Sequence, residues 1–235
     1  MKKSLMFSIG IIILAGLLGY QVFISGCSTT SSVSSSAETT TTVYTGSPTT
    51  TTLLGTAANY YPSSDGLSWT YESRFVDSTN PLNSYHITEK HTFRGSTNEV
   101  GTLTQIKQVE NYRLDSTTLL SSRESMEKIS STNVEYYGTK GAPTLPPLVI
   151  LQFPLAVGNS WSVYSTVQGV VSAAETITVP AGTYPCYRVD FKTGEIVLSS
   201  FWYAGGVGLV KSERKALIGG SITAVGTQEL TSINF

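Results

Sequence analysis

The sequence predicts an all-β domain, an antiparallel curved sheet or open barrel of about ten strands, preceded by a signal peptide and a disordered linker. Three observations predict it. An apolar run follows two lysines at the start of the chain, a Ser/Thr-rich tract comes next, and from Asn59 onward apolar and polar residues alternate with a period of two. The expected boundaries are 1–26 for the signal peptide, 27–58 for the linker and 59–235 for the domain.

The first segment has the pattern of a secretory signal, because Lys2 and Lys3 precede an apolar run that extends to about Tyr20. Residues 24–27 (Ile-Ser-Gly-Cys) resemble a bacterial lipobox, so Cys27 is expected to become the lipidated first residue of the mature protein, with palmitate among its acyl chains. The alternative is an uncleaved membrane anchor, since the segment 5–24 is about as long as a helix that spans a bilayer.

These features predict an exported protein that is lipid-anchored to the bacterial cell envelope. Ser28 follows the cysteine where some Gram-negative bacteria read Asp as an inner-membrane retention signal, so the outer membrane is expected if the envelope is Gram-negative. The membrane is therefore the first expected partner.

A tether is expected to follow, because residues 28–52 contain eighteen Ser or Thr in twenty-five positions. Such a tract cannot bury enough apolar surface to order itself. The whole chain has 15 basic and 16 acidic residues, and this balance lacks the positive patch that nucleic acid binding requires.

The domain itself shows strand periodicity almost throughout. Trp69, Tyr71 and Phe75 alternate with polar residues, and Val189 and Phe191 do the same later in the chain. No stretch of comparable length shows a helical stripe. Turns are expected at 179–183 and 204–208, where Pro and Gly interrupt the alternation.

An internal repeat accompanies this pattern. An aromatic-Pro pair, a Gly and a Ser-Trp pair at 61–69 recur at 153–161 with a constant offset of 92 residues. The repeat divides the domain into 60–152 and 153–235, and the segment 139–147 links the two parts. We expect Trp69 and Trp161 to fill the core, with paired ligand platforms as the alternative.

A family resemblance rests on the second part of the domain. Its residues are Phe153-Pro154-Leu155 with Trp161, the run 178–184 (Thr-Val-Pro-Ala-Gly-Thr-Tyr) with Cys186, and the run 202–211. Over residues 153–211 the chain resembles the TapB-like family of exported bacterial proteins, whose function is unknown. The resemblance implies an all-β, curved-sheet domain on a secreted or lipid-anchored chain, and it implies no catalytic residues.

Catalytic and metal-binding signatures are sparse. His86 and His91 are five positions apart and point to opposite faces of a continuous strand. The two side chains therefore cannot bind the same metal ion from one strand. Glu89 and His91 share a face, which could orient an imidazole for acid/base chemistry or could be an ordinary surface pair. Cys186 is expected to be a packed free thiol. No metal and no cofactor are expected.

The segment 196–203 is apolar on both faces. Its candidate ligand-binding residues are Ile196, Leu198, Phe201, Trp202 and Tyr203. A strand of this kind is either central and covered on both sides, or it lines an apolar groove.

Together these patterns favour a binding domain for an apolar ligand or a partner protein, without catalysis. Two alternatives remain open: an envelope hydrolase that uses Glu89 and His91, and an adhesion or scaffolding module that uses a flat face.

Overall fold

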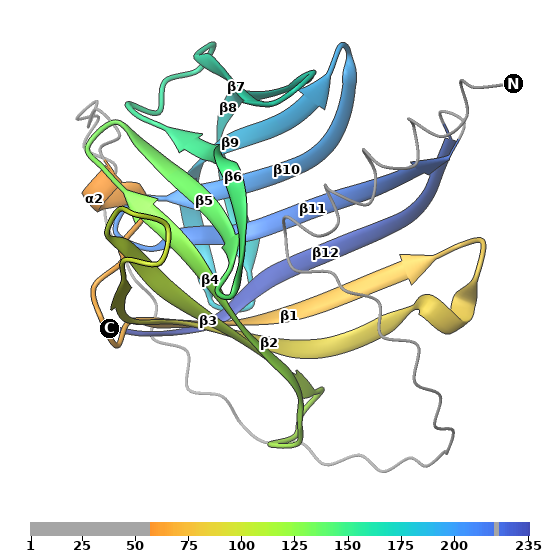
Figure 1. The fold of residues 1–235 in the computed structure, drawn as a ribbon. Coiled ribbons are helices and arrows are strands. Elements are labelled where there is room, and N and C mark those ends of the chain that lie inside the picture. The colour runs from red at the N-terminus through yellow and green to blue at the C-terminus, as the bar shows by residue number, and fades with distance from the viewer. Residues whose placement is uncertain (1–56, 219–220) are drawn as a thin grey trace, which may run out of the picture. The chain divides into compact units, whose positions relative to one another are not determined.

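The computed structural model describes residues 57–218 and 221–235. This part of the chain is almost entirely β-structure, in which each strand is antiparallel to its neighbours (Figure 1). Two short helical turns occur, α2 (Ala57–Tyr60) and a 3-10 turn (Pro81–Asn83). The strands are β1 (Ser68–Asp77), β2 (Tyr85–Thr97), β3 (Thr104–Arg113), β4 (Leu119–Ile129), β5 (Asn133–Thr139), β6 (Ala142–Gln152), β7 (Ser160–Tyr164), β8 (Val167–Val179), β9 (Gly182–Thr193), β10 (Ile196–Ala204), β11 (Gly208–Ile218) and β12 (Ser221–Asn234).

The strands form one sheet in the order β6-β5-β4-β3-β2-β1-β12-β11-β10-β9-β8-β7. Each strand therefore lies beside its neighbours in sequence, and the pairing of β1 with β12 joins the two ends of the domain. The two edge strands approach each other where the Trp161 indole Nε1 of β7 donates to the Val149 carbonyl of β6 at 2.9 Å. The sheet is thus nearly closed and barrel-shaped, which confirms the predicted fold class.

The described residues contain twelve strands rather than the expected ten or so. One reason is the segment 139–147, which the sequence analysis assigned to a link. It turns at residues 140–141 and continues as β6, in which Pro143, Pro146 and Pro147 lie on an edge strand. An edge strand has one side free of ladder hydrogen bonds, so proline is tolerated there.

The end of the barrel where the chain enters is closed by aromatic side chains. Tyr61 contacts Phe93 and Tyr203 at ring-centroid distances of 6.3 and 6.4 Å, and Trp69 contacts Phe93 at 5.9 Å. The Trp69 indole donates to the Val207 carbonyl at 2.7 Å. We call this end, with its loops 98–103, 153–159 and 205–207, the closed end.

The two Ser-Trp motifs begin their strands in the same way. Gly66 and Gly158 both adopt positive φ, at 87° and 96°, a conformation that favours glycine. The amide of each glycine donates to a carbonyl of the strand that pairs with the one it begins: Gly66 to Phe93 on β2, and Gly158 to Val171 on β8. Each of the predicted stretches, 60–152 and 153–235, supplies six strands. That the two stretches are repeats of one another stays a prediction.

Candidate functional site

The predicted carboxylate-imidazole pair lies inside the barrel, on β2. Glu89 and His91 point inward from this strand, and the Glu89 Oε1 atom lies 2.5 Å from the His91 Nε2 atom. Glu89 is buried, and the ring of Tyr71 on β1 lies 4.9 Å from the His91 ring. His86 points to the other side of the strand, where it contacts the exposed Glu72. The expectation that the two histidines face opposite ways is confirmed.

The pair belongs to a hydrogen-bonded network whose members come from three strands, β2, β12 and β11. The Gln228 side-chain amide of β12 donates to Glu89 Oε1 at 2.5 Å, and Ser212 of β11 donates to the Gln228 carbonyl oxygen at 3.3 Å. Gln228 and Ser212 are almost fully buried. Because buried polar groups are costly unless they are paired, this network accounts for the burial of Glu89, Gln228 and Ser212 in the middle of the barrel.

The electrostatics fix the protonation of the pair. Burial raises the pKa of Glu89, but the hydrogen bond from His91 and the charges of Arg123 and Arg214 outweigh burial and lower the pKa to about 2. Burial lowers the pKa of His91, an effect that Glu89 opposes. A neutral imidazole therefore donates its Nε2 proton to an ionised carboxylate, and this nitrogen is not available to accept a proton from a substrate or a nucleophile.

A second buried cluster lies nearer the closed end. The Tyr61 hydroxyl donates to Glu127 Oε2 at 2.7 Å, and the Lys107 ammonium donates to the Tyr61 oxygen at 3.0 Å. Lys107 also forms an ion pair with Glu127, whose side chain is 1% exposed. Sequence reasoning missed this cluster. A signal existed, since Glu127 shares strand parity with the inward-facing Ser125, but it does not identify Tyr61 as a partner.

The described residues contain no group of three or more His, Cys, Asp or Glu side chains arranged to hold a metal ion. Cys186 is buried, and burial, with a contribution from Glu175, raises the pKa of its thiol to about 12. A thiol with this pKa carries almost no thiolate at neutral pH and is a poor nucleophile.

The predicted apolar segment 196–203 lies entirely on β10. Phe201 and Tyr203 point into the barrel, and Trp202 lies on the other side of the strand, where its indole donates to Glu175 at 2.7 Å. All three are less than a tenth exposed. Leu198 is half-buried at an irregularity in the pairing of β10 with β9. Little of this segment is therefore open to a ligand; Ile196, which is 46% exposed, is the exception.

Ile196 belongs to a larger set of exposed apolar residues at one end of the barrel. The turns that follow β1, β3, β7 and β9 lie at the end opposite the closed end, as do the end of β11 and the start of β12, because consecutive strands alternate in direction (Figure 1). The shorter β5 ends opposite Ser125 in the middle of β4, so the β5–β6 turn does not reach this end. Within residues 57–218 and 221–235, eight of the twelve exposed large apolar residues lie at the ends of these five hairpins, and we call them the apolar rim: Val76, Leu82, Leu119, Leu120, Tyr164, Ile196, Ile218 and Ile222.

The side chains of the rim are well exposed, from 41% at Tyr164 to 94% at Leu82. The β7–β8 turn is tied to the β9–β10 turn by a hydrogen bond from Thr193 to Thr166 at 3.3 Å, so Tyr164 and Ile196 belong to adjacent turns. Of the residues predicted for ligand binding, the rim includes Ile196 only. The other seven rim residues were not predicted from the sequence, because a single apolar residue in a turn is common on protein surfaces.

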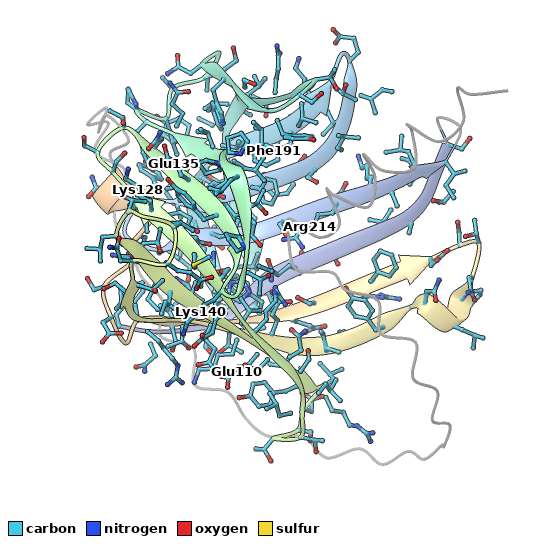
Figure 2. All side chains as sticks on the ribbon, in the orientation of Figure 1. Glu110, Lys128, Glu135, Lys140, Phe191 and Arg214 are labelled. Carbon is cyan, nitrogen blue, oxygen red and sulfur yellow. The ribbon has the colours of Figure 1, made fainter. Side chains whose placement is uncertain are left out.

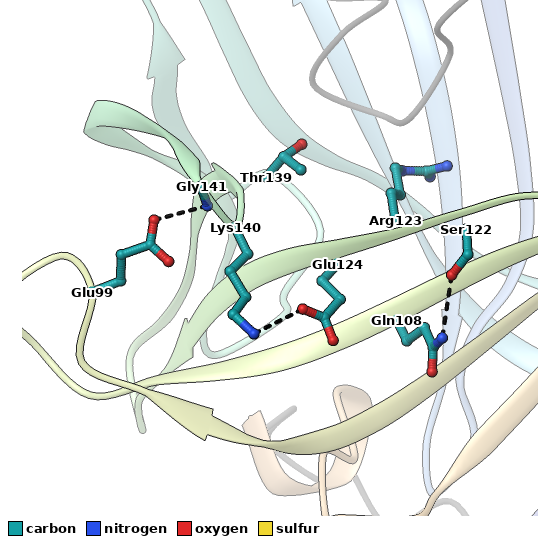
Figure 3. Close-up of a pocket in the computed structure, with 8 residues that line it drawn as sticks. All are labelled: Glu99, Gln108, Ser122, Arg123, Glu124, Thr139, Lys140 and Gly141. Atoms are coloured by element: carbon teal, nitrogen blue, oxygen red, sulfur yellow. Dashed lines mark hydrogen bonds and ion pairs between the residues drawn. The ribbon is translucent and has the colours of Figure 1, made fainter.

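A polar depression of about 680 Å³, lined in part by Lys140 (Figure 2), lies along β3 and β4 (Figure 3). Its charged groups are largely committed to one another: Lys140 pairs with Glu124 at 2.9 Å, and Glu99 accepts a hydrogen bond from the Gly141 amide at 2.8 Å. The depression is wide open to solvent and contains none of the predicted site residues. These contacts hold the β5–β6 turn and the loop 98–103 in place.

Cys27, the predicted signal peptide and residues 28–56 of the predicted linker lie outside the described residues, and the last two linker residues begin α2. Within residues 57–218 and 221–235, no helix combines the length and the apolar character that a membrane span requires.

Comparisons with known proteins identify one family in part of the domain. The model of the family described as DUF3108-like matches residues 159–216, less than half of the chain. This segment overlaps the region that resembles the TapB-like family, but the match is to the DUF3108-like model and does not show the TapB-like family. No curated protein matches the chain.

Three solved structures resemble the chain weakly. A "putative exported protein with YmcC-like fold" from Bacteroides fragilis has 13% identity and a TM-score of 0.44, and covers 75% of this chain and 99% of its own. A "putative lipoprotein" from Parabacteroides distasonis has 11% identity, a TM-score of 0.36 and the same coverage. A DUF1329 family protein from Desulfovibrio piger has 8% identity and a TM-score of 0.28, and covers 74% and 87%. With scores this low, function has to be argued from the residues of this chain.

Proposed function

We propose that this chain is an exported, lipid-anchored protein of the bacterial cell envelope whose β-domain binds an apolar ligand or a partner protein and catalyses no reaction. The proposed localisation rests on the secretory pattern and on Cys27. Ser28 favours the outer membrane in a Gram-negative envelope. The surface that binds is the apolar rim.

The clustering of the rim carries this proposal. Scattered exposed apolar residues are normal on any protein, whereas eight of twelve gathered on one end of a barrel mark a contact surface. The proposed contact surface is therefore the rim, and not the segment 196–203 that the sequence predicts. Ile196 belongs to both. Trp202 and Tyr203 support the sheet instead, because their side chains are buried against Glu175 and Tyr61.

The alternative of a hydrolase is favoured by one observation, the buried Glu89–His91 pair. The donation of the His91 Nε2 proton to Glu89 is compatible with that role, whereas the surroundings of the ring oppose it. A carboxylate that orients a catalytic histidine leaves the second ring nitrogen facing a nucleophile in a cleft. Here the ring of Tyr71 lies against the imidazole.

The test uses the unlipidated mature chain, with Cys27→Ser, and the fluorescent probe anilinonaphthalene sulfonate. We expect Ile196→Asp together with Ile218→Asp to weaken probe binding about fivefold, because each carboxylate replaces apolar contact surface. The matched control is Leu103→Asp together with Val157→Asp, since these residues are 68% and 58% exposed at the closed end. Equal weakening by both pairs, or hydrolysis of nitrophenyl esters that His91→Ala abolishes, would overturn the proposal.

A further inference from the structure

We infer that the apolar rim contacts the surface of the lipid bilayer in which the Cys27 anchor is inserted. The inference rests on the proposed function and names the apolar ligand of the same site: the lipid of a phospholipid membrane, rather than a soluble molecule or a protein.

The chemistry of the turns fits this partner. Seven of the eight rim residues are aliphatic and the eighth, Tyr164, carries the amphipathic ring that favours the interface of a membrane. Two of the five hairpins bring no charge with them, because the sequence contains no Asp, Glu, Lys or Arg between residues 156 and 174 or between 216 and 228. Inserting these turns among lipid headgroups removes no charged group from water.

The other three turns each contain one acidic residue, Asp77, Asp115 or Glu195. The Asp77 carboxylate is engaged within its own turn, where it accepts hydrogen bonds from the backbone amides of Thr79 and Asn80 at 2.8 and 2.9 Å. These turns can therefore rest at the level of the headgroups while the two uncharged hairpins reach further in.

The length of the tether allows this orientation. The Gly206 amide donates to the Asn59 carbonyl at 2.6 Å, so the tether joins the domain at the closed end, away from the rim. The longest strand, β12, has 14 residues and spans roughly 46 Å at about 3.3 Å per residue. Ala57 lies 57 − 27 = 30 positions after Cys27, and 30 residues reach about 100 Å when extended, so the domain can turn its rim toward the membrane.

The anchor also makes a weak contact sufficient. A domain joined to its anchor by 30 residues stays close to the bilayer, which gives the membrane surface a high effective concentration. The apolar side chains of the rim then need only a modest affinity for lipid to keep the rim in contact with the bilayer.

The first test measures depth in the bilayer with the full lipidated protein. Ile196→Cys and Ile218→Cys are labelled with a nitrobenzoxadiazole dye, and the protein is reconstituted in vesicles of phosphatidylethanolamine and phosphatidylglycerol that contain nitroxide-labelled lipid. Cys27 is acylated, and Cys186 is buried with a thiol pKa of about 12, so the introduced thiol is labelled selectively. We expect a blue shift and strong quenching at both rim positions.

The matched controls are Leu103→Cys and Val157→Cys, which are equally exposed apolar positions at the closed end. Quenching at the rim should exceed quenching at these positions about fivefold, because contact quenching requires insertion among the lipids. Equal quenching at both ends, or none at the rim, would overturn the inference.

A second measurement separates the inference from the proposed function. The unlipidated Cys27→Ser chain is floated with the same vesicles, and Ile218→Asp with Ile222→Asp should lower the bound fraction about tenfold at limiting lipid. If the rim neither quenches nor floats while rim substitutions still weaken probe binding, the rim holds a soluble ligand and the proposed function stands. If probe binding is also unaffected, both are wrong.

Discussion

The indole of Trp161 lies directly against the backbone of Gly169, its cross-strand partner on β8. A Cβ atom built at Gly169 would overlap the indole ring, and the same ring donates its N–H to Val149 on the opposite edge strand. One side chain thus fills the space left by a missing Cβ on one neighbour and ties the two edges of the sheet together. The absence of a side chain at position 169 is what allows the barrel to close over Trp161.

Gly169→Ala is therefore expected to destabilise the domain by about 1–3 kcal/mol, the usual cost of overpacking. Gly205→Ala is the control, because a Cβ there would meet the Tyr60 ring at an ordinary 3.6 Å. Urea unfolding measures both. A Gly169→Ala variant that is as stable as Gly205→Ala would show that the indole moves aside without cost.

Trp69→Ala and Trp161→Ala are each expected to cost about 3–5 kcal/mol, as large-to-small substitutions in a core do. The two indoles are 5% and 8% exposed, and each donates to a backbone carbonyl that would lose its partner. Thermal unfolding followed by circular dichroism checks this. Little loss of stability at either position would favour the alternative of a ligand platform.

Much of the fold could be predicted from the sequence, because the burial of alternate residues is a local property of a strand. Trp69, Tyr71 and Ser73 share the inward face of β1 as their spacing predicts. The strand β4 was harder to recognise, since Ser125 and Glu127 occupy buried positions where apolar residues are expected. Tertiary partners such as Tyr61 satisfy Glu127, and no local pattern contains that information.

The candidate site was predictable only in its local part. Glu89 and His91 are two residues apart, so their shared face follows from the period of a strand. Gln228 lies 139 positions from Glu89 and reaches it because β12 pairs with β1, which requires the complete topology. The rim has the same origin: Leu82 and Ile218 share one end of the barrel only because the strands alternate in direction around the sheet.

Cys186 is expected to react with iodoacetamide very slowly at pH 8 in the folded protein and fully after unfolding in urea. Its thiol is 4% exposed, and burial raises its pKa to about 12, so the reactive thiolate is scarce. Mass spectrometry of the alkylated protein gives the rate. Fast alkylation of the folded chain would contradict the burial of this residue.

Cys27 is expected to be the acylated first residue of the mature protein, because the sequence that precedes it resembles a lipobox. Mass spectrometry of the N-terminal peptide should show acyl chains on Cys27 and no residue before it. Cys27→Ala should move the protein out of the membrane fraction. A mature peptide that still contains Lys2, or an alanine variant that is processed and anchored as the wild type is, would contradict this prediction.

Glu89 is expected to make stability depend on acid pH. The folded pKa of its carboxyl is lowered to about 2 from an ordinary 4.5. A carboxyl with a depressed folded pKa contributes stability that is present above its unfolded pKa and is lost as pH falls toward the folded value. The contribution is therefore complete above about pH 4.5 and disappears between there and about pH 2, with an amplitude of roughly 3 kcal/mol at 1.4 kcal/mol per pKa unit.

Urea unfolding at a series of pH values from 7 to about 3 tests this dependence. Glu89→Gln should be less stable than the wild type at pH 7, because the amide does not carry the charge that His91, Arg123 and Arg214 stabilise. It should also lose less stability on acidification. Glu72→Gln, at the exposed pair with His86, is the control and should keep the slope of the wild type, since exposed ion pairs contribute at most about 1 kcal/mol. An acid slope in Glu89→Gln as steep as that of the wild type would assign the effect to other carboxyls.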